Sequence, residues 1–227
     1  SSEQPKGRRS MPTELSAERA VDTAQTLLDE ALRSGSRRML GIAGAPGAGK
    51  STLAARLAEQ LGTQAVLVPM DGFHLADVAL ARLGRLARKG APDTFDAGGY
   101  VALLQRLRTA RPQDAPVWAP MFERELEQPL AGAIEVRAEV PLVITEGNYL
   151  LLEDGPFAQV RAMLDACWFV EVPERLRHER LIARHERFGK SPQAARDWAL
   201  GPDEDNARLV AATRDRADVV VGVSSAR

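Results

Sequence analysis

The stretch from Gly44 to Ser51 has the pattern G-x-x-x-x-G-K-[ST]. Glycines let the backbone approach a phosphate closely and direct its N–H groups inward. The N-terminus of a following helix adds unpaired N–H donors and a partial positive charge. Lys50 would supply a point charge for the β- and γ-phosphates, and Ser51 a hydroxyl for Mg²⁺. The pattern predicts a nucleotide-phosphate site formed by Gly44, Ala45, Pro46, Gly47, Ala48, Gly49, Lys50, Ser51 and Thr52; the alternative is a glycine-rich turn that only starts a helix.

Two acidic residues follow apolar runs that have the length of buried strands. Asp71 comes just after the run 65–69, and parallel α/β sheets bind ligands beyond the carboxyl ends of their strands. Glu146 ends the run that starts at Leu142, as the Mg²⁺-binding acid of a Walker B strand does. We therefore expect Ser51 and Glu146 to hold Mg²⁺. The alternatives are a turn-capping role for Asp71 and an ordinary strand-ending carboxylate at Glu146.

Four arginines recur at spacings of 3, 4 and 3 residues, which puts them on one face of a helix. A lid that carries them could close over the phosphates and stabilise the charge in transfer. Arg180 and Arg184 are our first candidates, with Arg184 in a catalytic role, and Arg187 is the third. The alternative is a solvated basic face paired with neighbouring glutamates.

Several motifs resemble those of one kinase superfamily. Asp71-Gly72-Phe73-His74 is similar to the Asp-Gly/Ser-Phe motif of phosphoribulokinases, uridine kinases and bacterial pantothenate kinases. Glu146-Gly147-Asn148-Tyr149 and the segment 90–96 resemble the bacterial nucleoside/nucleotide kinase branch, which includes fructose-transport-system kinases. The segment 120–124, Pro-Met-Phe-Glu-Arg, resembles a piece of the acceptor site. The resemblance covers about residues 38–222.

The resemblance implies an ATP-dependent phosphotransferase that moves the γ-phosphoryl to a hydroxyl of a small molecule, with ATP and Mg²⁺ as cofactors. Asp71 would be the base. The acceptor would be a nucleoside, a sugar, a sugar phosphate or a pantothenate-like molecule. The implied acceptor-side residues are Asp71, His74, Thr94, Phe95, Asp96, Arg124, Glu146, Asn148 and Tyr149. Other roles stay open: His74 as a polar helix start, Thr94 or Asp96 as helix caps, and Arg124 as a surface partner of a nearby glutamate.

These residues must be positioned by a three-layer α/β/α fold with a mainly parallel sheet. The resemblance implies five strands in the order 2-3-1-4-5 and a helical lid. We expect a tail at 1–13, disordered or foreign to the natural chain, and one domain at 14–227. Within it we expect an acceptor-side insertion at about 75–138 and a lid at about 177–200. We also expect helices at 14–33 and 101–108, irregular chain at 109–132, and strands at 133–137 and 217–222.

Composition narrows the choice of partners. The 227 residues include 30 basic and 31 acidic ones, well mixed, for a net charge of −1. This balance gives no electrostatic footprint for nucleic acid or an anionic membrane. The single cysteine, Cys167, lies in an apolar run and is expected to be a buried thiol in a cytoplasmic protein. Dimers are the commonest homo-oligomers of soluble proteins, so a homodimer is the expected assembly. A nucleotide-dependent switch is the competing hypothesis, although the guanine-binding pattern Asn-Lys-x-Asp is absent from the sequence.

Overall fold

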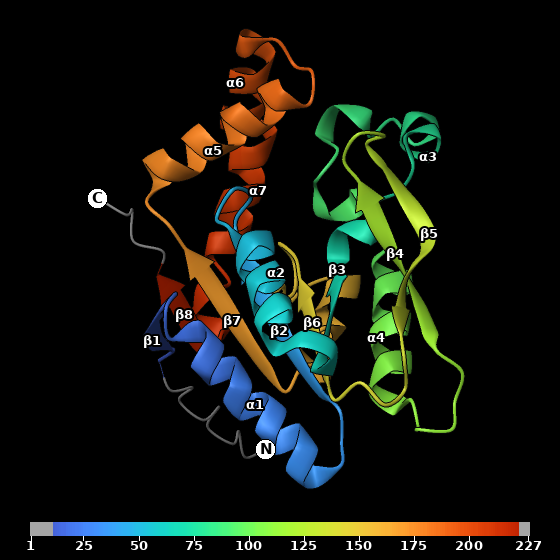
Figure 1. Ribbon diagram of the computed structural model, residues 1–227. Helices are drawn as coiled ribbons and strands as arrows, with labels where there is room; N and C mark the ends of the chain where they lie inside the picture. Colours follow the sequence, from blue (N-terminus) through green and yellow to red (C-terminus); the bar gives the residue numbers. More distant parts are fainter. Residues whose placement is uncertain (1–10, 223–227) are drawn as a thin grey trace, which may run out of the picture.

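A parallel sheet of six strands forms the centre of the computed structural model, which describes residues 11–222 (Figure 1). Its strands are β1 (Thr13–Ser16), β2 (Arg38–Gly44), β3 (Ala65–Pro69), β6 (Leu142–Glu146), β7 (Ala166–Glu171) and β8 (Val219–Gly222). The order is β1-β8-β7-β2-β6-β3, and every neighbouring pair is parallel. The five expected strands therefore occur in the expected order, and β1 is an addition.

The first residues of the chain differ from the expectation. The predicted helix at 14–33 is wrong at its start, because 13–16 form β1 and the helix α1 covers Ala20–Ser34. The backbone N–H of Thr13 donates to Asp218 at 3.0 Å, and β1 pairs with β8 along the edge of the sheet. The folded part thus includes Thr13, so the expected tail at 1–13 is too long at its end; residues 1–10 of that tail lie outside the described residues. Its partner strand lies about 200 residues further along the chain, out of reach of a local pattern.

Helices cover both faces of the sheet and make three layers. On one face, α1 and α2 (Lys50–Leu61) bury Leu28, Leu53 and Leu57 against Leu40 and Ile42 of β2. On the other face lie α4 (Ala97–Thr109) and α7 (Pro202–Ala211). Residues of β2 alternate between the two cores, as the two-residue period of a strand requires.

The acceptor-side insertion contains α3 (Asp77–Arg82), α4 and an antiparallel hairpin. The hairpin strands are β4 (Val117–Glu123) and β5 (Gln128–Val136), so our expectation of irregular chain at 109–132 is wrong. Pro120 and Pro129 argued against a strand, but the pairing shifts register between Ala119 and Met121, around Pro120. A two-stranded ribbon tolerates proline because half of its N–H groups face no partner.

The lid consists of α5 (Glu174–Arg187) and α6 (Pro192–Leu200), close to the expected range. In Figure 1, α5 and α6 rise on one side of the upper end of the sheet, with α3 and the hairpin on the other. The carboxyl ends of β2, β3 and β6 lie between these two parts, where a ligand of a parallel sheet is expected.

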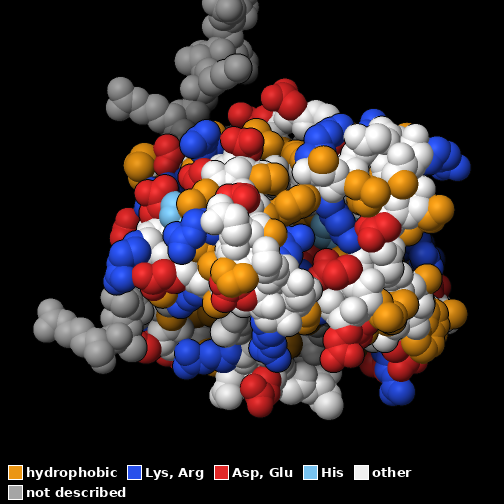
Figure 2. All heavy atoms as spheres, turned by 90° about the horizontal axis from the view of Figure 1, so that it is seen from above, with side chains coloured by type: hydrophobic (Ala, Val, Ile, Leu, Met, Phe, Trp, Pro, Cys, Tyr) orange, Lys and Arg blue, Asp and Glu red, His pale blue; other side chains and the backbone are white. Residues whose placement is uncertain are grey.

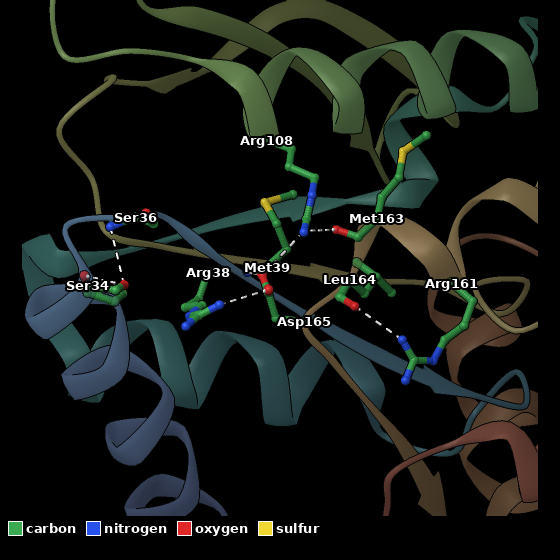
Figure 3. A network of polar contacts seen from close by, with 10 residues as sticks. Ser34, Ser36, Arg38, Met39, Arg108, Arg161, Met163, Leu164 and Asp165 are labelled. Atoms are coloured by element: carbon green, nitrogen blue, oxygen red, sulfur yellow. Dashed lines mark hydrogen bonds and ion pairs between the residues drawn. The ribbon is translucent and has the colours of Figure 1, made fainter. Parts of the chain in front are cut away.

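A polar network fixes the opposite end of the sheet (Figure 3). The carboxylate of Asp165 accepts from the backbone N–H of Met39 at 2.8 Å and from Arg38 at 3.2 Å. Arg108 of α4 donates to the Met163 carbonyl at 2.9 Å. These contacts join α4, β2 and the start of β7. They hold together the end of the sheet that lies opposite the ligand site.

None of the described helices is both long enough and apolar enough to cross a membrane. Cys167 is buried in β7, and burial raises the pKa of its thiol to about 12. The predicted role of a structural thiol agrees with this position.

Candidate active site

A cavity of about 400 Å³ opens at the carboxyl ends of the strands, between the lid and the acceptor-side insertion. Figure 2 looks down on this face, where basic and acidic side chains and a histidine meet at a hollow. The lining residues that the sequence predicted are Pro46, Lys50, Ser51, Asp71, His74, Phe95, Arg124, Glu146, Asn148 and Arg184. The cavity thus unites residues from the phosphate loop, two strand ends, the hairpin and the lid.

Lys50 is the first residue of α2 and lies at the base of this cavity. It is 8% exposed, and its Nζ donates to the Ala45 carbonyl at 3.2 Å. Burial lowers the pKa of Lys50, while the charges of Glu146 and Asp71 raise it. A lysine beside the phosphate loop can supply a positive charge to the β- and γ-phosphates.

At Gly47 the phosphate loop is in contact with the lid helix α5. Its φ is +78°, and an added Cβ would lie 2.7 Å from Leu181 and 2.9 Å from the Arg177 carbonyl of α5. The lid helix therefore packs directly on the loop, and a side chain at this position would push the two apart.

Ser51 and Glu146 form the predicted pair. The Ser51 hydroxyl donates to Oε1 of Glu146 at 3.1 Å, because β2 and β6 are neighbours with Ile42 opposite Glu146. Glu146 is 4% exposed, and burial, followed by the charge of Asp71, raises its pKa to about 7. A hydroxyl and a buried carboxylate are hard oxygen donors, which fits Mg²⁺. These two residues would hold the ion.

Asp71 lies in a short 3₁₀ turn, Met70–Phe73, directly after β3. Arg124 donates to its Oδ2 at 2.9 Å, and Nε2 of His74 is 3.9 Å from its Oδ1. Burial raises the pKa of Asp71, but the charges of Arg124 and Lys50, and of His74 where it is protonated, outweigh burial and hold the pKa below its usual value. Asp71 is ionised at neutral pH, and Arg124 pairs with it rather than with a neighbouring glutamate.

The residue after Asp71 in this turn is Gly72, and close packing against the hairpin explains why it is a glycine. A Cβ there would collide with the carbonyl of Pro120 in β4. The turn and the hairpin are therefore in direct backbone contact, which brings Arg124 to Asp71.

His74 is held between two rings. The ring centroids of Phe95 and Phe122 lie 4.1 and 4.7 Å from that of His74, and His74 forms an isolated antiparallel bridge with Phe95. Burial lowers the pKa of His74 to about 4. The imidazole is thus neutral near pH 7.

The pKa of His74 predicts a loss of stability in acid. Between pH 6.5 and about 4 the unfolded chain binds the proton and the folded chain does not, so stability falls as pH drops through this window. The shift corresponds to roughly 3 kcal/mol. Urea titrations at pH 7 and pH 4.5 should show this loss in the parent and a smaller loss in His74→Gln. An equal loss in both proteins would contradict the prediction.

The lid arginines have different positions. Arg184 lines the cavity, and burial lowers its pKa. Nη1 of Arg180 would lie 3.4 Å from a Cβ added at Gly49, so this side chain borders the phosphate loop. Arg177 is buried and pairs with Glu204. Arg187 lies over the ring of Phe188, 5.8 Å from its centroid, and is not among the lining residues.

The loop before α4 is supported by three residues that we expected at the acceptor. Thr94 accepts from the Gly90 N–H at 2.9 Å and donates to Ala91, and the Tyr149 hydroxyl donates to the Gly90 carbonyl. Asp96 caps α4 by accepting from Gly99 at 2.8 Å. Thr94, Asp96 and Tyr149 are not among the lining residues. Asp96 caps α4 and the other two brace the loop, while the acceptor-side role of all three stays a prediction.

Other lining residues were not assigned by the motifs. Four come from the lid: His185, Phe188, Lys190 and Trp198. Lys190 lies 4.6 Å above the Trp198 ring, and His185 pairs with Asp203 of α7 at 2.7 Å. Lys89 binds Asp77 at 2.7 Å. Asn206 of α7 also lines the cavity.

A second cavity, of about 650 Å³, lies on the other side of the phosphate loop. Ala45 and Ala48 of the loop form one wall, and Val172, Pro173 and Ala211 contribute further apolar surface. Because both cavities border the phosphate loop, one could bind the phosphate donor and the other the phosphate acceptor.

This arrangement, with a nucleotide-phosphate loop, an acid on the neighbouring strand and an arginine lid, defines a P-loop kinase. The chain belongs to the superfamily of phosphoribulokinases, uridine kinases and bacterial pantothenate kinases. This assignment rests on the similarity of the chain to three relatives. The "Putative uridine kinase C227.14" of Schizosaccharomyces pombe is 34% identical over 69% of each chain. The "Uncharacterized protein YggC" of Escherichia coli is 33% identical over 82% of this chain and 77% of that protein.

A solved structure agrees in fold. The "putative fructose transport system kinase" from Silicibacter sp. TM1040 is 39% identical, with a TM-score of 0.78 over 88% of this chain and 98% of that one. A family model described as the methylmalonyl Co-A mutase-associated GTPase MeaB matches residues 12–70, which contain the phosphate loop. That match ends before Asp71 and covers no part of the acceptor side.

Proposed function

We propose that this kinase moves the γ-phosphoryl of ATP to a hydroxyl of a small molecule. One observation carries the proposal: an ionised carboxylate, Asp71, lies in the same cavity as Lys50 and the Ser51–Glu146 pair. A switch that only hydrolyses nucleotide would not need an acceptor-side cavity with this carboxylate at its base.

The chain's own residues suffice to position the reaction. The phosphate loop and Lys50 bind the β- and γ-phosphates, and the second cavity receives the nucleoside against its apolar wall. When bound to Ser51 and Glu146, Mg²⁺ neutralises charge on the phosphates. Arg184, and Arg180 beside Gly49, offset the negative charge from the lid side.

Asp71 accepts a hydrogen bond from the acceptor hydroxyl and takes its proton as the oxygen attacks phosphorus. The depressed pKa makes Asp71 a weak base, which suits a loose transition state in which the proton leaves late. Arg124 orients the carboxylate, while the lid excludes water.

The decisive experiment is an ADP-release screen with Mg²⁺-ATP and a set of hydroxyl compounds: nucleosides, free sugars, sugar phosphates, glycerate and pantothenate. We expect release above the rate with water for at least one class. Release that is the same with every compound and with water would favour the switch. We also propose a cytoplasmic location. The balanced charge supports the further proposal that the protein has no nucleic-acid or membrane partner. We propose a homodimer because dimers are the commonest homo-oligomers.

Glu146→Gln should raise the Mg²⁺ concentration needed for half-maximal activity. The substitution keeps the shape of the side chain and removes the charge that binds the ion. The measurement is a Mg²⁺ titration of transfer, with Glu153→Gln, an exposed acid with an ion pair to Arg216, as a matched control. An unchanged Mg²⁺ dependence in Glu146→Gln would remove this residue from the metal site.

A further inference from the structure

The hairpin turn between β4 and β5 holds a glutamate in a conformation that usually calls for glycine. Among residues 11–222, Glu127 is the one residue other than glycine with a positive φ, 53°. L-residues avoid this left-handed region because Cβ crowds the following carbonyl. Hairpin turns accordingly favour glycine or asparagine there. Such a residue persists where its surroundings fix it, and often at a functional site.

Lys89 fixes this backbone from outside the hairpin. Its Nζ donates to the Glu127 carbonyl at 2.7 Å and to the Asp77 carboxylate at 2.7 Å. The side chain of Lys89 is mostly buried, and its ammonium lies 5.5 Å from the centroid of the Phe122 ring. The left-handed turn is therefore held by a cation that belongs to the acceptor-side loop.

The side chain of Glu127 is half-buried and lines the cavity. The other carboxylates of that lining have partners: Asp71 pairs with Arg124, Asp77 with Lys89, Glu146 with Ser51 and Asp203 with His185. Within the described residues, the Glu127 carboxylate has neither a hydrogen bond nor an ion pair. Its charge acts on Arg184 of the lid. Burial lowers the pKa of Arg184, and Glu127 is one of the carboxylates whose charge raises it.

We propose that Glu127 binds the phosphate acceptor, and that it accepts hydrogen bonds from neighbouring hydroxyls of a polyhydroxylated molecule. This inference rests on the proposed function. An ionised carboxylate only accepts hydrogen bonds, so its ligand must present donors. Its two oxygens can receive two adjacent hydroxyls at once. Phe122, Phe188 and Trp198 line the same cavity, each with a basic side chain over its ring.

A free sugar and the ribose of a nucleoside share this chemistry. The experiment therefore compares ribose, fructose, uridine and adenosine with pantothenate, which lacks adjacent hydroxyls. The variants are Glu127→Gln, which keeps the shape, and Glu127→Gly, which removes the side chain. Glu125→Gln is the control, because Glu125 is exposed in the same turn and does not line the cavity.

We expect the parent to prefer an acceptor with adjacent hydroxyls. Both Glu127 variants should raise the KM for that acceptor by about tenfold or more, the effect of losing a charged hydrogen bond. The KM for ATP and the hydrolysis of ATP without acceptor should stay within about threefold, and Glu125→Gln should match the parent. A monodeoxy analogue should lower kcat/KM about tenfold in the parent and much less in Glu127→Gln.

Thermal unfolding separates binding from folding. Glu127→Gly relieves the left-handed strain but makes the unfolded chain more flexible, so its Tm should lie within about 3 °C of the parent. A larger fall in Tm with unchanged acceptor KM would make Glu127 a structural residue and overturn the inference. An equal loss of transfer and of acceptor-free ATP hydrolysis would place its effect on the lid and also overturn it.

Failure of the proposed function gives a different result. A parent protein that phosphorylates none of the compounds would overturn that function and this inference together. Transfer by the parent with unchanged KM in both Glu127 variants would overturn the inference alone.

Discussion

Lys50→Met is expected to abolish phosphoryl transfer, with a loss of about 10²–10³-fold or more in kcat. The ammonium lies nearly buried in the cavity and donates to a carbonyl of the phosphate loop, so its charge is fixed beside that loop. Methionine keeps the unbranched stem and removes the charge. Affinity for ATP should also fall, because the phosphates lose a charge partner.

The measurements are kcat with the best acceptor from the screen and ATP affinity by titration. Lys190→Met is the matched control, since Lys190 lines the same cavity but lies over Trp198 on the lid. Transfer within tenfold of the parent in Lys50→Met would mean that the loop is a structural turn without a role in phosphate binding.

Asp71→Asn is expected to bind ATP within a few-fold of the parent and to lose transfer by about 10²–10⁴-fold. The carboxylate is ionised and accepts from Arg124, so it is available for the acceptor hydroxyl. An amide of the same shape keeps the turn but cannot take the proton. The measurements are turnover with the best acceptor and ATP affinity.

Glu125→Gln serves as the control, because Glu125 is an exposed carboxylate of the hairpin turn and does not line the cavity. Turnover within tenfold of the parent would exclude Asp71 as the base. A loss of ATP affinity would place Asp71 on the metal instead, and Glu146, whose pKa is about 7, would become the candidate base.

The elements closest to the phosphates could be predicted because their information is local. The phosphate loop is one continuous pattern, and Asp71 and Glu146 each follow an apolar run that ends at the same edge of the sheet. In a parallel sheet this rule needs no knowledge of the rest of the fold. The order of the five main strands followed from the resemblance.

The remaining parts depend on contacts between distant segments. β1 is four residues long and exists through its pairing with β8. The hairpin contains prolines and a register shift that hide its alternation. His185, Trp198 and Asp203 reach the cavity only because α5, α6 and α7 pack over it. Thr94 and Asp96 fall in the expected segment, and their side chains accept from the backbone N–H groups of Gly90 and Gly99.

The contact between Gly72 and Pro120 determines which segment of the chain would have to be transplanted to exchange acceptor specificity between related kinases. The Gly72 backbone meets the backbone carbonyl and the rigid ring of Pro120 there, so neither side can absorb a change in spacing. A transplanted hairpin with a slightly different path would therefore displace the turn that carries Asp71. The exchangeable unit is residues 70–138, which includes that turn, rather than the insertion at 75–138 alone. A chimaera cut after the turn should fold and bind nucleotide but misplace its base, whereas a cut before it carries base and acceptor pocket together.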